Sequence, residues 1–466
     1  MNAAAGRVLL IGLDCLGPEV LDPARGLMPS LAALAQRHPS GTLLSTLPPI
    51  TVPAWTSMLT GCDPGELGIY GFRNRRSFAY GDLALATSNW VRRPRVWDRL
   101  SQAGRPSLVI GLPQTSPPPP LQGNLVSGFE GPVEGRYTHP PSLAAEVESI
   151  TGGYLFDVPD FRRIELSQVV EIVYAMTERR FRLMRRLMAS KPWDFALLHE
   201  IGPDRIHHCF WRYHDPRHRS YQPSSGFGAV VREYYRFLDS QVAELIAEVG
   251  STAAVLVASD HGVQPMDGGV CVNEVLLDAG LLSLRATPVQ PTALSPEMVR
   301  WERTTAWAEG GYYARVFLNV RGREPRGTVV PDQMRTARRR VAEALAQVQL
   351  PDGRVLHNRV EQPAKLYREV RGIAPDLLVF FQDQRWRSVG SVGTGSHVAA
   401  ENDTGADGAN HAREGMFLLA APGAGPATQQ RASILDVAPT LLELLGLPPD
   451  PRLSGRPLAV EPAVSR

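Results

Sequence analysis

The sequence predicts an α/β protein built on a doubly wound, mostly parallel sheet with helices on both faces. Short apolar runs at residues 8–13, 193–199 and 253–258 are continuous, as in strands buried on both faces of a parallel sheet. Longer segments with helical periodicity, residues 166–187 and 230–249, lie between these runs. After residue 262 the chain departs from this rhythm, which predicts a smaller α+β cap inserted into the sheet protein.

Length and composition narrow the class of protein. The chain has 466 residues, enough for two or three structural units. A hydrophobic content of 43% and a formal net charge of +2 favour neither a nucleic-acid partner nor a membrane surface. The apolar run at residues 8–13 is too short for a signal peptide or a membrane span. The four scattered cysteines are too few for a disulfide framework, so we expect them to be reduced and the protein to be cytoplasmic.

We expect three segments in chain order. Residues 1–262 form the first part of the α/β core, residues 263–400 form the α+β cap, and residues 401–466 close the core. The elements expected in the core are strands at 8–13, 40–45, 107–110, 193–199, 253–258 and 416–420 and helices at 28–36, 96–102, 166–187, 230–249 and 434–446. In the cap, alternation at 313–319 and an amphipathic pattern at 334–346 predict a strand and a helix, and its rim would carry substrate specificity.

A further helix is predicted to begin just after Thr51. Pro53 presets a helical φ and lacks only an amide that the first turn could not use, and Trp55, Met58 and Leu59 recur at helical spacing. The unpaired amides and the positive dipole end of such a helix favour a phosphate group or the alkoxide of Thr51. The alternative is that Thr51 is an N-cap residue and nothing more.

Carboxylates and histidines follow the predicted strands. Asp14 comes directly after the first strand, and Asp260, His261 and a glycine come after the strand at 253–258. The carboxyl ends of parallel strands face the ligand crevice of an open sheet, so these side chains are site candidates. The glycine allows a sharp turn, and an aspartate buried there without a cation would be costly.

Two more candidates lie farther along the chain. Asp204 and His208 are four residues apart and, on a helix, would share one face and hold one metal ion, with His207 as an alternative ligand. His411 follows a long loop of turn-forming residues, 396–410, just before the strand at 416–420.

The candidates taken together suit a two-metal site. Three aspartates and three histidines with one hydroxyl among them are a ligand set for two zinc-like ions, and Mn²⁺ is the alternative metal. One ion would lower the pKa of the hydroxyl and the other would activate water or hold the leaving oxygen, which is the apparatus for displacement at phosphorus. The set consists of Asp14, Thr51, Asp204, His208, Asp260, His261 and His411.

This ordered set resembles the alkaline phosphatase superfamily and, within it, the type I phosphodiesterase/nucleotide pyrophosphatase family. The resemblance runs from residues 12–14 to the closing segment at 436–440 and fills every metal and nucleophile position. It implies an alkaline phosphatase-like fold and a Thr51 that takes up the phosphoryl group covalently, expels an alcohol or nucleotide, and is freed by hydroxide. It also implies two zinc ions, one held beside Thr51 by Asp14, Asp260 and His261 and the other by Asp204, His208 and His411.

From the resemblance we expect a metal-dependent hydrolase of phosphodiester or nucleotide pyrophosphate bonds that acts on a small phosphate ester or nucleotide. Animal-type nucleotide pyrophosphatases carry an asparagine shortly after the nucleophile, where this sequence has Ala54 and Trp55, so nucleotide specificity stays open. The sulfatase signature is absent from the nucleophile segment, which disfavours sulfate esters.

Alternatives within the superfamily are a phosphomonoesterase, a phosphonate hydrolase and a phosphotransferase. A basic pocket that reads the dianionic end of a monoester would favour the first, with arginines such as Arg73, Arg75 and Arg315 as candidates. The alternative from another class is a non-catalytic binding protein, but neither a ligand nor the hydroxyl is missing. The sequence leaves the oligomeric state open.

Overall fold

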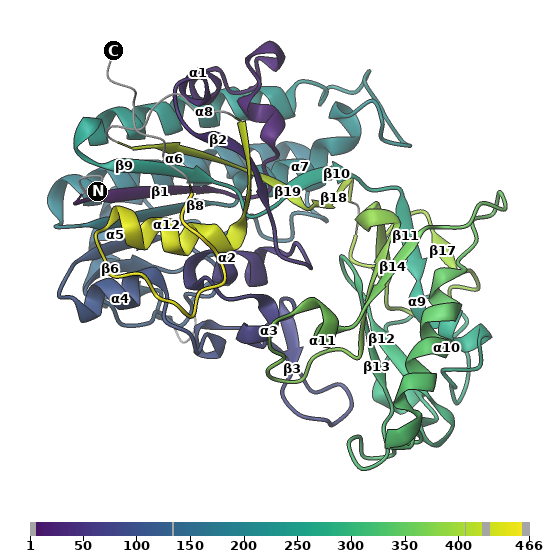
Figure 1. Cartoon of the computed structure of the whole chain (residues 1–466). Coiled ribbons are helices and arrows are strands. Elements are labelled where there is room, and N and C mark those ends of the chain that lie inside the picture. The colour runs from purple at the N-terminus through teal and green to yellow at the C-terminus, as the bar shows by residue number, and fades with distance from the viewer. Residues whose placement is uncertain (1–5, 133–134, 406, 422–428, 459–466) are drawn as a thin grey trace.

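The computed structural model describes residues 6–132, 135–405, 407–421 and 429–458. A nine-stranded sheet forms the centre of the core (Figure 1). From edge to edge its strands are β20 (Gln429–Ser433), β2 (Ser40–Leu44), β19 (Glu414–Ala420), β9 (Ala254–Ala258), β1 (Val8–Leu13), β8 (Phe195–Glu200), β5 (Ser107–Ile110), β6 (Gly123–Val126) and β7 (Thr138–His139). The central strands β9, β1, β8, β5 and β6 are parallel, whereas β19 and β7 run antiparallel to their neighbours. The predicted mostly parallel sheet is therefore confirmed.

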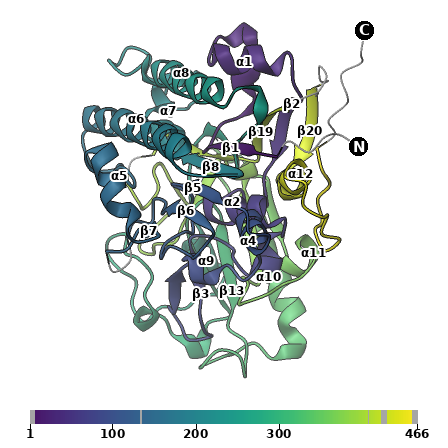
Figure 2. The same cartoon turned by 90° about the vertical axis from the view of Figure 1, so that its left-hand side faces the viewer.

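Helices cover both faces of this sheet, as predicted (Figure 2). One face carries α1 (Pro29–Ala35), α5 (Leu143–Thr151), α6 (Leu166–Ser190), α7 (Gly202–His214) and α8 (Val230–Val249); the other carries α2 (Thr51–Thr60), α4 (Val96–Gln102) and α12 (Val437–Leu444). Alternate residues of β1 pack into two separate clusters: Leu9 and Ile11 face one set of helices, and Val8 and Leu10 face the other. Burial of both faces explains why the strand sequence is continuously apolar.

The cap is built on a second sheet. Its strands follow the order β12 (Ala306–Glu309), β13 (Ala314–Leu318), β15 (Leu377–Phe381), β16 (Trp386–Val389), β11 (Gly268–Cys271) and β17 (Val398–Ala399), and β14 (Asn358–Glu361) also pairs with β15. Two helices, α9 (Val272–Asp278) and α10 (Met334–Ala346), pack on it through a third hydrophobic cluster that includes Leu276 and Val341. The expected α+β character is confirmed, and the division at residues 263 and 400 stays a prediction.

Segments from before residue 262 also contact the cap. The hairpin of β3 (Arg73–Arg75) and β4 (Leu83–Leu85) bridges to Ile373, and the ring of Tyr80 stacks on that of Trp301 with centroids 3.5 Å apart. The short helices α3 (Pro64–Leu67) and α11 (Pro363–Leu366) lie where core and cap meet. No helix in the described ranges is both long enough and apolar enough to cross a bilayer.

A two-stranded antiparallel ribbon connects the two sheets. It pairs β10 (Gly262–Pro265) with β18 (Ala409–Ala412) (Figure 1). In this pairing Val263 lies opposite His411. His411 therefore lies inside a strand, so the prediction that it lies between a loop ending at residue 410 and a strand beginning at residue 416 was wrong. Four residues with an asparagine and a histidine give no alternation of apolar and polar side chains, so sequence periodicity could not identify this strand.

Candidate metal centre

The site lies at the carboxyl ends of the central strands. Asp14 follows β1, and Asp260 and His261 follow the neighbouring β9. The next strand, β8, leads into α7, which carries Asp204 and His208 one helical turn apart. The ribbon then brings His411 beside the turn that holds His261. Parallel strands thus gather residues that are far apart in the chain, as the sequence predicted.

Thr51 is the first residue of α2. The N-cap position is taken by Ile50, whose backbone is extended, and no side chain caps the helix. The Thr51 hydroxyl is buried and lies 3.3 Å from His261 Nε2. The alternative role of Thr51 as an N-cap is therefore wrong, and its hydroxyl faces the candidate ligands.

The first group of ligands surrounds His261. Its Nε2 lies 3.6 Å from Asp14 Oδ1 and 3.3 Å from Asp260 Oδ2. All three side chains are fully buried, and their ligand atoms lie within 4.8 Å of one another. This group, with the Thr51 hydroxyl beside it, has the size and donor types of a single cation site.

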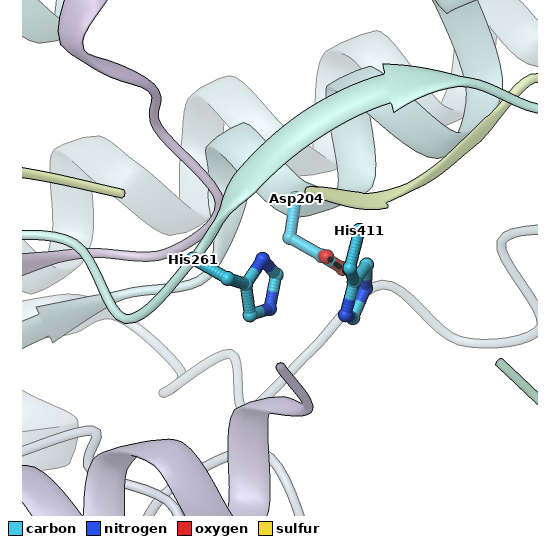
Figure 3. Close-up of side chains that lie close together, drawn as sticks. All are labelled: Asp204, His261 and His411. Atoms are coloured by element: carbon cyan, nitrogen blue, oxygen red, sulfur yellow. Dashed lines mark ion pairs between the residues drawn. The ribbon is translucent and has the colours of Figure 1, made fainter. Parts of the chain in front are cut away.

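The second group is a triangle of Asp204, His208 and His411. The Nε2 atom of His208 lies 3.2 Å from Asp204 Oδ1 and 3.4 Å from His411 Nε2, and His411 Nε2 lies 3.5 Å from the same carboxylate oxygen. The two groups adjoin, because the rings of His261 and His411 stack with centroids 3.7 Å apart (Figure 3). Asp204, His261 and His411 also lie within 4.8 Å of one another.

Three carboxylate oxygens in these groups accept no hydrogen bond from the described residues. They are Asp14 Oδ1, Asp204 Oδ1 and Asp260 Oδ2, and all three are buried. A buried, unpaired carboxylate oxygen is costly unless a cation or a proton compensates its charge. The donor set therefore fits divalent cations.

The histidine rings are oriented by contacts at Nδ1. This atom lies 3.2 Å from the Gly262 carbonyl in His261, 2.9 Å from the Pro49 carbonyl in His411, and 2.8 Å from Asp407 Oδ1 in His208. Carbonyl and ionised carboxylate oxygens only accept, so Nδ1 donates and a neutral ring keeps its lone pair on Nε2. In its neutral form each ring would therefore offer the Nε2 lone pair inside the site.

Burial and charge crowding shift the pKa values of the metal-free groups. Burial raises the pKa of Asp14 to about 7, against the opposing effect of His261, and burial with the charge of Asp14 raises the pKa of Asp260 well above its usual value. The pKa of His208 is raised to about 10 because Asp204 and Asp407 outweigh its burial. Without metal ions the first group therefore keeps a proton, since the close carboxylates of Asp14 and Asp260 resist simultaneous ionisation. In contrast, and against the effect of burial, His208 holds the pKa of Asp204 well below its usual value.

Two residues that hold Asp14 were not predicted. The indole Nε1 of Trp55 donates to Asp14 Oδ2 at 2.9 Å, and His199 Nε2 lies 2.9 Å from the same oxygen. The Trp55 ring passes so close to Gly12 that only glycine fits there. The sequence pattern identifies Trp55 only as an apolar residue of a helix. His199 could have been identified, because it lies near the carboxyl end of β8, where site residues gather.

Asp407 was also missed. Besides His208, its carboxylate binds Arg162 and Arg387, each at 2.8 Å through Oδ2. Arg205 pairs with Asp157 at 2.7 Å and also contacts Asp204. Asp407 lies in the segment that the sequence identified only as turn-forming. The arginines next to the site thus have carboxylate partners.

Other sequence candidates are used elsewhere. The Nε2 atom of His207 lies 2.6 Å from the Tyr235 hydroxyl, and it is His208 that contacts Asp204 and His411. Arg75 forms a buried ion pair with Glu324 at 3.1 Å, and Arg315 donates to the Arg73 carbonyl. The last two arginines connect the β3–β4 hairpin to the cap and do not form a phosphate pocket.

Comparison with known proteins identifies the family. Residues 8–409 match the family described as type I phosphodiesterase / nucleotide pyrophosphatase. Among solved structures, murine and human ectonucleotide pyrophosphatase/phosphodiesterase 5 are similar in fold, with TM-scores of 0.52 and 0.54. Each is 14% identical, and each alignment covers 96% of both chains, so the likeness shows the expected fold alone. No curated protein matches the sequence. Since the family match spans most of its length, this chain belongs to the type I phosphodiesterase/nucleotide pyrophosphatase family of metal-dependent phosphoric ester hydrolases.

Proposed function

We propose that this chain hydrolyses phosphodiester or nucleotide pyrophosphate bonds with Thr51 as nucleophile and two divalent metal ions, Zn²⁺ or alternatively Mn²⁺. The observation that carries the proposal is the place of the Thr51 hydroxyl, 3.3 Å from His261 Nε2 of the first ligand group, whose ring stacks on that of His411 in the second. Family membership supports phosphoric ester hydrolysis. Three buried aspartate oxygens that accept no hydrogen bond from the described residues support a pair of cations.

Each ligand group would hold one ion. Asp14, Asp260 and His261 would hold the ion next to Thr51, and Asp204, His208 and His411 would hold the other. Imidazole nitrogens and carboxylate oxygens are ligands that zinc accepts. When bound, such ions neutralise phosphoryl charge and lower the pKa of a hydroxyl.

The reaction we propose has two displacements. The Thr51 oxygen forms a bond to phosphorus while the bond from phosphorus to the leaving oxygen breaks; the threonine proton passes to water, and the leaving oxygen takes a proton from water. A water oxygen then attacks phosphorus, the bond to Thr51 breaks, and the hydroxyl regains its proton. The N-terminus of the ten-residue helix α2 favours the negative charge that stays on the phosphoryl group.

A diester or pyrophosphate substrate fits the surrounding charges. The family acts on small phosphate esters or nucleotides. Two arginines considered for a monoester pocket, Arg75 and Arg315, instead make contacts between the β3–β4 hairpin and the cap. We also propose that the protein works in the cytoplasm, where its four free and buried cysteines would stay reduced.

Hydrolysis of bis-p-nitrophenyl phosphate against p-nitrophenyl phosphate, with zinc or manganese added, tests the proposal. The wild type should prefer the diester, and Thr51→Ala should lose turnover while keeping its metal content. Thr60→Ala is the matched control: it removes a hydroxyl from the same helix, but this hydroxyl donates to the Thr56 carbonyl. It should keep full activity.

Trapping supplies the second readout. Acid quenching of the wild type during turnover of bis-p-nitrophenyl phosphate should yield a peptide in which Thr51 carries a p-nitrophenyl phosphoryl group, because the first displacement expels only one nitrophenol. Peptide mass spectrometry detects this adduct. Unchanged rates in Thr51→Ala would disprove the assigned nucleophile. A preference for the monoester would instead favour the phosphomonoesterase alternative, and inactivity on both esters would direct the assays to phosphonates and phosphotransfer acceptors.

A further inference from the structure

The cap contributes one side chain directly to the candidate metal centre. Tyr312 lies between β12 and β13 and is partly buried. Its hydroxyl is 3.2 Å from His208 Nε2, and its ring lies on that of His411 with centroids 3.9 Å apart. With His261 stacked on His411 as well, three rings form a column that begins beside Thr51. The phenol therefore faces the same space as the proposed ligands.

Tyr312 is held in place by its backbone and by an arginine. The preceding residue, Gly311, exchanges two hydrogen bonds with Ser388 of β16, at 2.8 and 2.9 Å. The guanidinium of the buried Arg387 lies 4.2 Å from the centre of the Tyr312 ring. Arg387 also pairs with Asp407, the carboxylate that orients His208. Such anchoring from several sides is what a preorganised functional group requires.

The Tyr312 hydroxyl contacts His208 Nε2, the nitrogen to which a metal ion would bind. Once a cation takes the Nε2 lone pair of His208, that nitrogen can no longer form a hydrogen bond with the phenol. The phenol O–H can then donate its hydrogen bond to another acceptor that binds next to it in the site. A negatively charged phosphoryl oxygen is a strong acceptor for it.

Most charged and indole side-chain donors that the structure describes next to the site already have acceptors, although Nε of Arg387 is buried without one. The guanidinium groups of Arg162, Arg205 and Arg387 are paired with aspartates, and the indole N–H of Trp55 donates to Asp14. We propose that Tyr312 is a catalytic residue supplied by the cap, which donates a hydrogen bond to a non-bridging phosphoryl oxygen of the substrate. This inference rests on the proposed function, because it assigns the His208 nitrogen to a metal ion.

The test compares Tyr312→Phe with the wild type in two measurements. Calorimetric titration of the zinc-loaded proteins with inorganic phosphate should show binding about tenfold or more weaker in the variant, as for the loss of a hydrogen bond to a charged group. The value of kcat/KM for bis-p-nitrophenyl phosphate should fall by at least a similar factor. Zinc content, measured by mass spectrometry of the metal, should stay at the wild-type level.

Tyr313→Phe is the matched control. Tyr313 is the next residue, but its hydroxyl donates to the Tyr70 carbonyl, and its ring stacks on Phe380 with centroids 5.3 Å apart. Its loss should leave phosphate affinity unchanged. Equal phosphate affinity in Tyr312→Phe and the wild type would overturn the proposal. Loss of zinc from Tyr312→Phe would overturn it too, because the phenol would then support the metal ion and not the phosphoryl group.

These outcomes are distinct from a failure of the proposed function. A wild type that is inactive on both esters would refute phosphodiester hydrolysis, while the phosphate titration would still report on Tyr312. If Tyr312→Phe hydrolyses the diester as readily as the wild type does, the role of Tyr312 is refuted while the proposed function stands.

Discussion

Replacing Gly12 with alanine tests how firmly the Asp14 carboxylate is held. A Cβ atom at this position would lie 2.5 Å from Cη2 and 2.9 Å from Cζ3 of Trp55, well inside the usual carbon–carbon contact of about 3.5–4.0 Å. Trp55 is fully buried and donates to Asp14, so its ring cannot move without moving the carboxylate. Overpacking of this kind costs about 1–3 kcal/mol, and we expect Gly12→Ala to lose that much free energy of unfolding.

A double-mutant cycle with Trp55→Phe isolates this contact. Phenylalanine lacks the outer ring atoms that meet the new methyl group, so the double variant should lose less stability than the two single variants together, by about 1 kcal/mol or more. Urea unfolding of the metal-free proteins, followed by circular dichroism, measures each step.

Zinc binding gives the functional readout of the same cycle. Trp55→Phe should bind zinc about 10–100-fold more weakly, because Asp14 loses the donor that orients it. Gly12→Ala should also weaken zinc binding, since the displaced indole carries the carboxylate with it. Stability losses that add within about 0.5 kcal/mol, with zinc affinity unchanged in Gly12→Ala, would refute the reasoning.

Three other perturbations give separate expectations. Zinc binding should tighten from pH 6 to pH 8 and should release more protons at pH 6. The reason is that the metal-free pKa is about 7 for Asp14 and about 10 for His208, and only the deprotonated side chains bind metal. Calorimetry in two buffers measures the affinity and the proton release, and a pH-independent affinity would contradict the expectation. Asp407→Asn should weaken zinc binding about 10–100-fold, since His208 loses its carboxylate partner, and equilibrium dialysis should detect the change. Glu324→Gln should lower the free energy of unfolding by about 3–5 kcal/mol by leaving Arg75 buried without its counter-ion, whereas its zinc affinity should equal that of the wild type.

Much of the core could be predicted from the sequence. Its long helices and central strands have strong periodicity, and residues 230–249 form α8 with the predicted bounds. Asp260 and His261 could be found because a buried strand ends at them. The structure brings all seven candidate residues together, while their roles as nucleophile and metal ligands stay proposals.

The supporting residues could not be predicted, for physical reasons. The sequence pattern of a tryptophan on the apolar face of a helix is the same whether its indole N–H is free or donates to a carboxylate. The contact of Trp55 with Asp14 could therefore not be predicted. Asp407 lies among turn-forming residues, where aspartate is common. Tyr312 reaches the site only because β13 and β16 pair with β15 across the cap sheet, and such long-range pairing is not encoded in local periodicity.

The ribbon of β10 and β18 brings the two ends of the cap together. Pro265 pairs with Ala409, so the chain enters and leaves residues 266–408 at adjacent points. An insertion of another length or shape could replace the present one while the ribbon still closed and kept His411 opposite Val263. Evolution could thus vary the substrate without rebuilding the six proposed metal ligands, although each new cap would have to supply its own counterparts of Asp407 and Tyr312.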